Sequence, residues 1–182
     1  AHRVLPEIEA RTGVSFVYRP VLLGGIFKAT NNQAPMIAFG DIPAKMAYDG
    51  LEMERFIARH NLTNFKMNPN FPIITLQLMR AATAAEADGY LMDFISAMLP
   101  CMWEKGLKMD DPDVIRTAFT DAGFDADKLF EQMASDEIKG QLVANTQAAV
   151  DRGAFGIPTF FVGDEMFFGK ERLGQVEELL QA

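Results

Sequence analysis

Residues that could hold a small anionic or peptide-like ligand concentrate near the C-terminal end of this 182-residue sequence. The run Gly169-Lys170-Glu171-Arg172 stands where a helix is expected to begin. Free backbone N–H groups and the dipole at a helix start favour a bound carboxylate, although an acidic residue such as Glu171 is also ordinary in a first helical turn. Earlier in the chain, Ile157-Pro158 indicates a turn, and the peptide bond before a proline can be cis.

A hairpin must position these groups. Residues 158–162 form an apolar run of strand-forming residues, which is joined through Gly163-Asp164 to a second run at residues 166–168. This pattern predicts two antiparallel strands with a two-residue turn. Because proline cannot donate to a sheet ladder, Pro158 is expected to open the first strand rather than lie inside it. Residues 171–181 should follow as a helix that buries its leucines.

The composition argues against several other kinds of site. Cys101 is the only cysteine, so these residues contain no disulfide and no Cys-x-x-Cys pair, and with two histidines we expect no metal site. Cys101 lies in an apolar helical stretch, where a buried small side chain is more common than a nucleophile. The net charge of -8 argues against nucleic acid, and no apolar run is long enough to span a membrane. We expect a cytoplasmic protein.

The first part of the chain reads as a helix followed by a strand. Residues 1–11 have a helical pattern that ends at Thr12-Gly13, and residues 14–19 alternate apolar and polar side chains until Pro20. Since the sequence opens inside a helix and without an initiator Met, we expect residues ahead of Ala1. Residues 21–41 have no sustained period and predict a long loop with a short helical turn.

The middle of the chain predicts helices. Asp41 is the expected N-cap of a helix that reaches about residue 61, with Pro43 in its first turn, and residues 68–72 form a rigid connector. Residues 73–152 should be helical throughout, with Pro100 kinking or shortening one helix. The expected N-caps of the later helices are Asp111, Asp125 and either Ser135 or Asp136.

This order of elements predicts an α/β protein with an insertion. The two ends, residues 1–40 and 153–182, are each too small to bury a core alone, so they should pack into one sheet. The helical block at residues 41–152 is then an inserted all-α domain.

The same order, with several motifs, resembles the family of 2-hydroxychromene-2-carboxylate isomerases and kappa-class glutathione transferases. The resemblance extends over the whole chain, and several motifs in the right order are more specific than any one alone. They are Ala1-His-Arg-Val-Leu, Leu23-Gly-Gly-Ile-Phe-Lys-Ala-Thr-Asn-Asn32, Phe71-Pro72, Gly153-Ala-Phe-Gly-Ile-Pro-Thr-Phe-Phe-Val and Phe168-Gly-Lys-Glu-Arg-Leu173.

The resemblance implies a thioredoxin-like fold with an inserted helical domain, as in disulfide oxidoreductases of the DsbA type, and glutathione in the cleft between the two domains. It implies a glutathione-dependent isomerase that acts on 2-hydroxychromene-2-carboxylate or a related intermediate of aromatic catabolism. The family's catalytic serine precedes the first helix, so the catalytic residue here is unknown and is expected, with the first strand, upstream of Ala1. We also expect a homodimer.

The site residues follow from the resemblance, position by position. Ile157 and Pro158 match the cis-proline turn that pairs with the cysteinyl part of glutathione, and Lys170 and Glu171 match the γ-glutamyl end, where many relatives have Asp in place of Glu171. Asn32 matches the family's Gly-Asn loop position, and Asn31 replaces the usual glycine before it, which is tolerable because Asn also accepts left-handed geometry. Two lysines complete the set: Lys45 for the glycyl carboxylate and Lys28 for the carboxylate of an aromatic substrate.

Three alternatives remain open on the sequence alone. A kappa-type glutathione transferase would use the same thiolate on an electrophile without releasing it. A DsbA-like thiol-disulfide oxidoreductase would need a Cys-x-x-Cys turn ahead of Ala1. A degenerate thioredoxin-like binding module would have neither the serine nor the cysteines.

Overall fold

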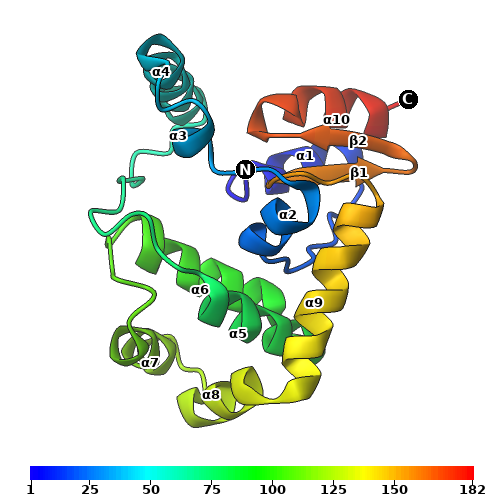
Figure 1. The fold of residues 1–182 in the computed structure, drawn as a ribbon. Helices are drawn as coiled ribbons and strands as arrows, with labels where there is room; N and C mark the ends of the chain where they lie inside the picture. Colours follow the sequence, from blue (N-terminus) through cyan, green and yellow to red (C-terminus); the bar gives the residue numbers. More distant parts are fainter. The chain divides into compact units, whose positions relative to one another are not determined.

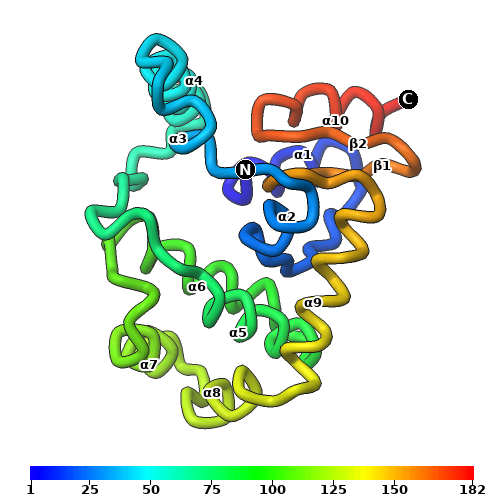
Figure 2. The backbone as a smooth tube through the Cα atoms, viewed as in Figure 1, coloured from blue at the N-terminus to red at the C-terminus, as the bar shows by residue number.

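The structure, a computed structural model, describes residues 1–182. Its contacts divide the chain into two compact units. Unit 1 comprises Ala1–Arg19, Leu23–Leu62 and Thr146–Ala182, and unit 2 comprises Pro20–Leu22 and Thr63–Asn145. Figure 1 labels the helices and strands, and Figure 2 traces the backbone from blue to red. No helix combines the length and apolar character that a membrane crossing requires.

The predicted hairpin is confirmed in unit 1. Strands β1 (Thr159–Val162) and β2 (Glu165–Phe168) pair antiparallel, and the pairing of Val162 with Glu165 leaves Gly163-Asp164 as the two-residue turn. Gly163 has a φ of 58°, the left-handed conformation that glycine adopts easily. A short 3₁₀ helix, η1 (Lys170–Arg172), then leads into α10 (Leu173–Leu180), which packs against both strands (Figure 1).

The core of unit 1 joins its first helix to its last. Helix α1 (Leu5–Thr12) ends at Gly13, as predicted, where a φ of 71° allows the left-handed cap. Val4, Leu5 and Ile8 are buried against Leu173 of α10. Because this cluster is apolar and closed to water, it holds α1 and α10 together and thereby fixes the turn that precedes α10.

The strand predicted at residues 14–19 does not form. The segment is extended but makes no backbone ladder, and the N–H of Phe16 instead donates to the Glu9 carboxylate at 2.7 Å. Its alternation still predicts sidedness correctly, because Phe16 and Tyr18 pack on the α1 core while Val17 is 83% exposed. A strand needs a neighbouring backbone as well as a pattern, and this segment has none.

The loop predicted at residues 21–41 is largely helical, so that prediction is wrong. It contains α2 (Leu23–Thr30) and a single turn, α3 (Pro35–Ala38). Gly24-Gly25 disfavours a helix, but Ile26 of α2 is completely buried. Burial of such a side chain is worth about 2 kcal/mol, which is comparable to the cost of about 1 kcal/mol for each glycine.

Helix α4 (Pro43–Arg59) confirms the helix predicted in this region but not its cap. The N-cap is Ile42, which makes no side-chain cap, and Pro43 supplies the first turn. Asp41 is therefore not the N-cap. Phe56 packs against the α1 core, which explains why α4 belongs to unit 1.

Unit 2 is built from helices, as predicted. They are α5 (Leu76–Ala87), α6 (Leu91–Trp103), α7 (Pro112–Asp121), α8 (Ala126–Ala134) and most of α9 (Asp136–Asp151). Asp111 and Asp125 cap α7 and α8, and the Ser135 hydroxyl accepts from the N–H of Ile138 at the start of α9. Phe94 and Phe119, whose rings lie 5.6 Å apart, join α6 to α7 in the core.

Pro100 lies inside α6, which continues past it to Trp103, and Cys101 and Met102 beyond the proline are buried. The expected domains at residues 1–40, 41–152 and 153–182 stay a prediction; in the structure, α4 and the end of α9 group with unit 1.

Candidate functional site

The turn that precedes β1 presents a free backbone edge. The Ile157–Pro158 peptide bond is cis, and the Thr159 hydroxyl donates to the Gly156 carbonyl at 2.7 Å. Ile157 is 44% exposed, and neither its N–H nor its carbonyl has a hydrogen-bond partner. The turn can therefore pair with an extended peptide in the manner of an added strand.

Gly169, at the end of β2, is hydrogen-bonded to this turn. Its N–H donates to the Pro158 carbonyl at 2.9 Å, which extends the β1–β2 ladder by one position. Its backbone, at φ 92° and ψ 155°, lies in a region that only glycine adopts without strain. A Cβ at this position would lie 2.7 Å from Glu171 Oε2. The glycine thus brings the start of η1 beside the turn. Extending the predicted hairpin by one residue pair beyond Thr159 and Phe168 would have predicted the hydrogen bond between Gly169 and Pro158.

Asn32 anchors the turn from α2. Its Nδ2 donates to the Phe155 carbonyl at 2.8 Å, and its Oδ1 accepts from the Gln33 N–H at 2.8 Å. Asn31 before it has a φ of 53°, the left-handed geometry expected at that position. The side-chain amide of Asn32 is therefore used to position the turn.

Lys170 and Glu171 form an ion pair at the start of η1. The Lys170 ammonium lies 5.3 Å from the centre of the Phe56 ring, and the Lys170 side chain is only 17% exposed, against 46% for Glu171. Partial burial would raise the pKa of Glu171. The hydrogen bonds from Lys170 and the backbone, with the charges of Lys170 and Arg172, outweigh burial and hold this pKa below its ordinary value. A pair of opposite charges therefore directly follows Gly169, whose N–H is bonded to Pro158 of the turn.

Two aromatic residues that the sequence did not single out flank the turn. The rings of Phe155 and Phe168 lie 4.5 Å apart, and both side chains are partly exposed. A Cβ on Gly156 would lie 2.8 Å from the Phe168 ring, so this glycine permits the close approach. The two phenyl groups give the turn an apolar border.

The two remaining predicted lysines do not join this group. Lys45 of α4 binds both carboxylate oxygens of Asp49 at 2.6 Å, and its ammonium lies 5.2 Å from the centre of the Phe39 ring. Lys28, in the last turn of α2, is exposed and makes no ion pair. Neither is bonded to the Ile157 turn, so their roles in binding remain predictions.

His2 and Tyr18 form a half-buried pair near the start of α1. The Nδ1 of His2 lies 2.7 Å from the Tyr18 hydroxyl. Burial, with a contribution from Glu9, raises the pKa of Tyr18 to about 12, and burial with the charge of Arg3 lowers the pKa of His2. These shifts keep both side chains neutral at pH 7.

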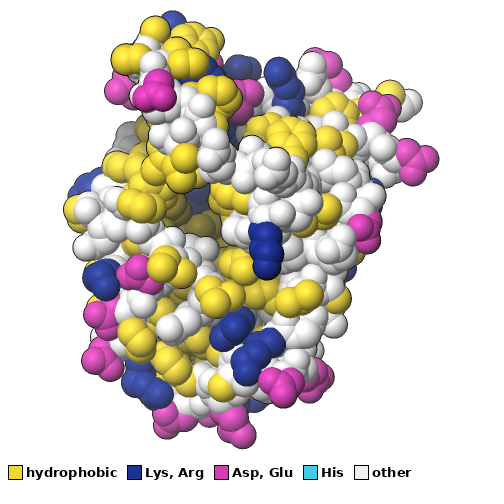
Figure 3. All heavy atoms as spheres, viewed as in Figure 1, with side chains coloured by type: hydrophobic (Ala, Val, Ile, Leu, Met, Phe, Trp, Pro, Cys, Tyr) yellow, Lys and Arg dark blue, Asp and Glu magenta, His cyan; other side chains and the backbone are white.

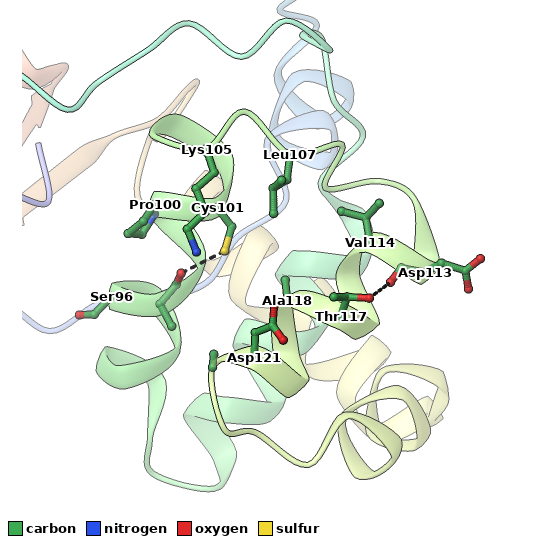
Figure 4. Close-up of a pocket in the computed structure, with 12 residues that line it drawn as sticks. Ser96, Pro100, Cys101, Lys105, Leu107, Asp113, Val114, Thr117, Ala118 and Asp121 are labelled. Carbon is green, nitrogen blue, oxygen red and sulfur yellow. Dashed lines mark hydrogen bonds between the residues drawn. The ribbon is translucent and has the colours of Figure 1, made fainter.

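A separate cavity of about 750 Å³ lies within unit 2. Figure 4 shows it between α6 and α7, with Lys105 and Asp121 on opposite sides. Cys101 lines it but is only 5% exposed, and burial raises the pKa of its thiol. This confirms the prediction of a buried small side chain. None of the residues expected to hold glutathione lines this cavity.

Comparison with known proteins relates this arrangement to characterised chains. The family model of the DSBA-like thioredoxin domain matches residues 1–181. A 2-hydroxychromene-2-carboxylate isomerase of Sphingobium xenophagum is 28% identical over 97% of this chain and 88% of its own length. Human glutathione S-transferase kappa 1 is 26% identical over 92% of this chain and 78% of its own length.

A solved structure supports the fold. The structure of a 2-hydroxychromene-2-carboxylate isomerase superposes with a TM-score of 0.82 at 20% identity, covering 98% of this chain and 85% of that chain. At this identity the likeness concerns the fold, which is the thioredoxin-like fold with inserted helices that the sequence predicted.

Proposed function

The chain belongs to the DSBA-like thioredoxin-domain family, and on this basis we propose that it is a glutathione-dependent isomerase. Its substrate would be 2-hydroxychromene-2-carboxylate or a related intermediate of aromatic catabolism. The observation that carries the proposal is the exposed, unpaired backbone edge of Ile157. The similarity to an isomerase of Sphingobium xenophagum along nearly the whole chain supports it.

A peptide thiol fits the residues around this edge. Backbone pairing at Ile157 needs no particular side chain and aligns a ligand by the geometry of its own peptide groups. The amide of Asn32 and the N–H of Gly169 hold the two sides of the turn, at Phe155 and Pro158. The ligand therefore meets an edge that is already ordered, which lowers the entropy cost of binding.

The charged pair at η1 suits the γ-glutamyl end of glutathione, which carries both an ammonium and a carboxylate. Glu171, ionised because its pKa is low, would accept from the ammonium. Lys170 and the N–H groups at the start of η1 would hold the carboxylate. The Lys170–Glu171 ion pair places the two charges next to each other, as a zwitterionic group requires.

Bound glutathione would supply a nucleophilic thiolate for the isomerisation. The chain's own residues would orient glutathione and the substrate and bind their carboxylates. We propose that Lys45 binds the glycyl carboxylate, for which it must give up part of its contact with Asp49. We propose Lys28 for the substrate carboxylate, and a serine upstream of Ala1 for the thiolate.

The nearest alternative is a kappa-type glutathione transferase, which the similarity to human glutathione S-transferase kappa 1 supports. A thiol-disulfide oxidoreductase would need a Cys-x-x-Cys turn ahead of Ala1, since the one cysteine of this sequence is buried. As further parts of the proposal, the protein is a homodimer and is cytoplasmic.

Calorimetric titration of the full-length protein with glutathione tests the cofactor. We expect saturable binding below millimolar concentration, and Lys170→Gln should weaken it while Lys108→Gln, on an exposed lysine of unit 2, should not. Absence of binding at millimolar glutathione would contradict the proposal.

An activity assay tests the reaction. Absorbance should report interconversion of the chromene acid and its isomer only when glutathione is present. If the protein binds glutathione and conjugates generic electrophiles but does not interconvert the chromene acid, the transferase assignment replaces the isomerase.

A further inference from the structure

The cavity between α6 and α7 has a size and a lining that suit a small organic ligand. Its volume of about 750 Å³ lies within the range of about 300–1,000 Å³ that is usual for small-molecule sites. All of its lining residues belong to unit 2. Figure 3 shows hydrophobic side chains over α6 and α7, bordered by charged side chains of both signs. The larger apolar groups of the lining are Pro100, Leu107 and Val114 (Figure 4).

The segment between α6 and α7, which carries Lys105 and Leu107, is fixed in place by a buried amide. Asn68 is only 2% exposed, and its Nδ2 donates to the carbonyls of Met102, at 2.8 Å, and Leu107, at 2.9 Å. The N–H of Leu107 also donates to the Cys101 carbonyl at 2.9 Å. This wall of the cavity is therefore ordered before a ligand arrives, which lowers the entropy cost of binding.

Two opposite charges line the cavity without an ion-pair partner. Lys105 and Asp121 lie on opposite sides of it (Figure 4), and neither forms a salt bridge. Both act on the thiol of Cys101, because burial raises the pKa of this thiol, Lys105 lowers it and Asp121 raises it further. Each of the two charges is therefore available to a ligand group of the opposite sign.

The surroundings of Asp121 favour a bound cation. Asp121 is the last residue of α7, at the negative end of the helix dipole, and the last turn of α7 contains no basic residue. Asp113 adds a second carboxylate to the lining, whereas Lys105 is its only basic residue. A ligand that carries a carboxylate alone would therefore be repelled, and one that also carries an ammonium would not.

We propose that this cavity binds a small zwitterion, with an apolar body that carries a carboxylate at one end and an ammonium at the other. The carboxylate pairs with Lys105 and the ammonium with Asp121, while the body packs on the apolar side chains between them. Burying a charge is costly unless it is paired, so each end of the ligand needs the partner that the cavity supplies. This binding requires neither glutathione nor the proposed isomerase reaction.

Calorimetric titration of the full-length protein with 4-(aminomethyl)benzoate tests the site. This probe has an ammonium and a carboxylate at opposite ends of a benzene ring. We expect saturable binding, and binding about tenfold weaker for benzoate and for benzylamine, each of which lacks one charged end. Absence of saturable binding, or equal affinity for the three compounds, would overturn the proposal.

Two variants assign the ends of the probe. Lys105→Met removes the ammonium but keeps an apolar stem, and it should weaken binding of 4-(aminomethyl)benzoate about tenfold without weakening that of benzylamine. Asp121→Asn should weaken the binding of both compounds. The control is Lys108→Met, because Lys108 pairs with Asp110 and does not line the cavity. Loss of binding in Lys170→Gln instead would assign the probe to the glutathione turn and contradict the proposal.

The thiol of Cys101 gives an independent readout that needs no variant. Cys101 lines the cavity, so bound probe should slow its alkylation by iodoacetamide, measured by mass spectrometry of the peptide that contains it. At ten times its dissociation constant the probe leaves about a tenth of the protein free, so the rate should fall about tenfold. An alkylation rate that the saturating probe does not change would contradict binding in this cavity.

Discussion

Replacing Gly169 by alanine tests how the turn and the start of α10 are held together. The residue has φ 92° and ψ 155°, a conformation that costs a non-glycine residue about 1–3 kcal/mol. The added Cβ would also lie 2.7 Å from Glu171 Oε2, so the Glu171 carboxylate must move away from its place beside the turn. We therefore expect the variant to lose about 2 kcal/mol of unfolding free energy and to bind glutathione more weakly.

Thermal unfolding measures the first effect and calorimetry the second. For a chain of this size, about 2 kcal/mol lowers Tm by roughly 4–8 °C. Gly174→Ala is the matched control, because Gly174 lies inside α10 and a Cβ there meets nothing within 4 Å. The control should be neutral or slightly stabilising. If Gly169→Ala unfolds at the wild-type temperature and binds glutathione equally well, Gly169 does not hold the turn as we describe.

Three further outcomes follow from the same contacts. Asn32→Ala should lower stability by about 1 kcal/mol and weaken glutathione binding, because the Phe155 carbonyl loses its donor; unchanged affinity would remove Asn32 from the site. Glu171→Gln should weaken glutathione binding, whereas wild-type affinity should not vary through Glu171 between about pH 6 and pH 8. The pKa of Glu171 lies below its ordinary 4.5, so the stabilisation by its charge is present above that value and is lost only as the pH falls further. Ultraviolet titration should show Tyr18 ionising near pH 12, and Tyr18→Phe should remove that step. Since the pKa of Tyr18 is raised from 10.0, the contribution of its neutral hydroxyl to stability is complete below pH 10 and is lost as the pH rises to 12. Ionisation of all three tyrosines near pH 10 would contradict the half-buried contact between Tyr18 and His2.

Local signals in the sequence predicted the hairpin and most helices. The two-residue turn at Gly163-Asp164 and the caps at Asp111 and Asp125 depend on neighbouring residues only, and all were correct. The segment at residues 14–19 failed because a strand also needs a partner backbone, which a single segment cannot reveal. Helix α2 was missed because the burial of Ile26 is a tertiary effect that offsets its glycines.

The candidate site was predictable to a similar degree. Two hydrogen bonds link the segments that carry Asn32, Ile157-Pro158 and Lys170-Glu171. Asn32 donates to the Phe155 carbonyl, and the Gly169 N–H donates to the Pro158 carbonyl. Spacing alone could not place Phe155 and Phe168, since the contact between their rings depends on how the turn folds back. The contact of Lys45, in contrast, could be predicted from spacing. Its partner Asp49 stands four residues later, which is the spacing of an ion pair on one face of a helix.

The backbone amide of Ile157 provides the most direct test of the glutathione site. In an amide nuclear magnetic resonance spectrum of the full-length protein, titration with glutathione should shift the Ile157 signal saturably. The signals of Gly169 and Lys170 should move with the same apparent affinity, because these residues border the same edge. An Ile157 signal that stays fixed at saturating glutathione, or shifts confined to the cavity around Cys101 in unit 2, would contradict the account.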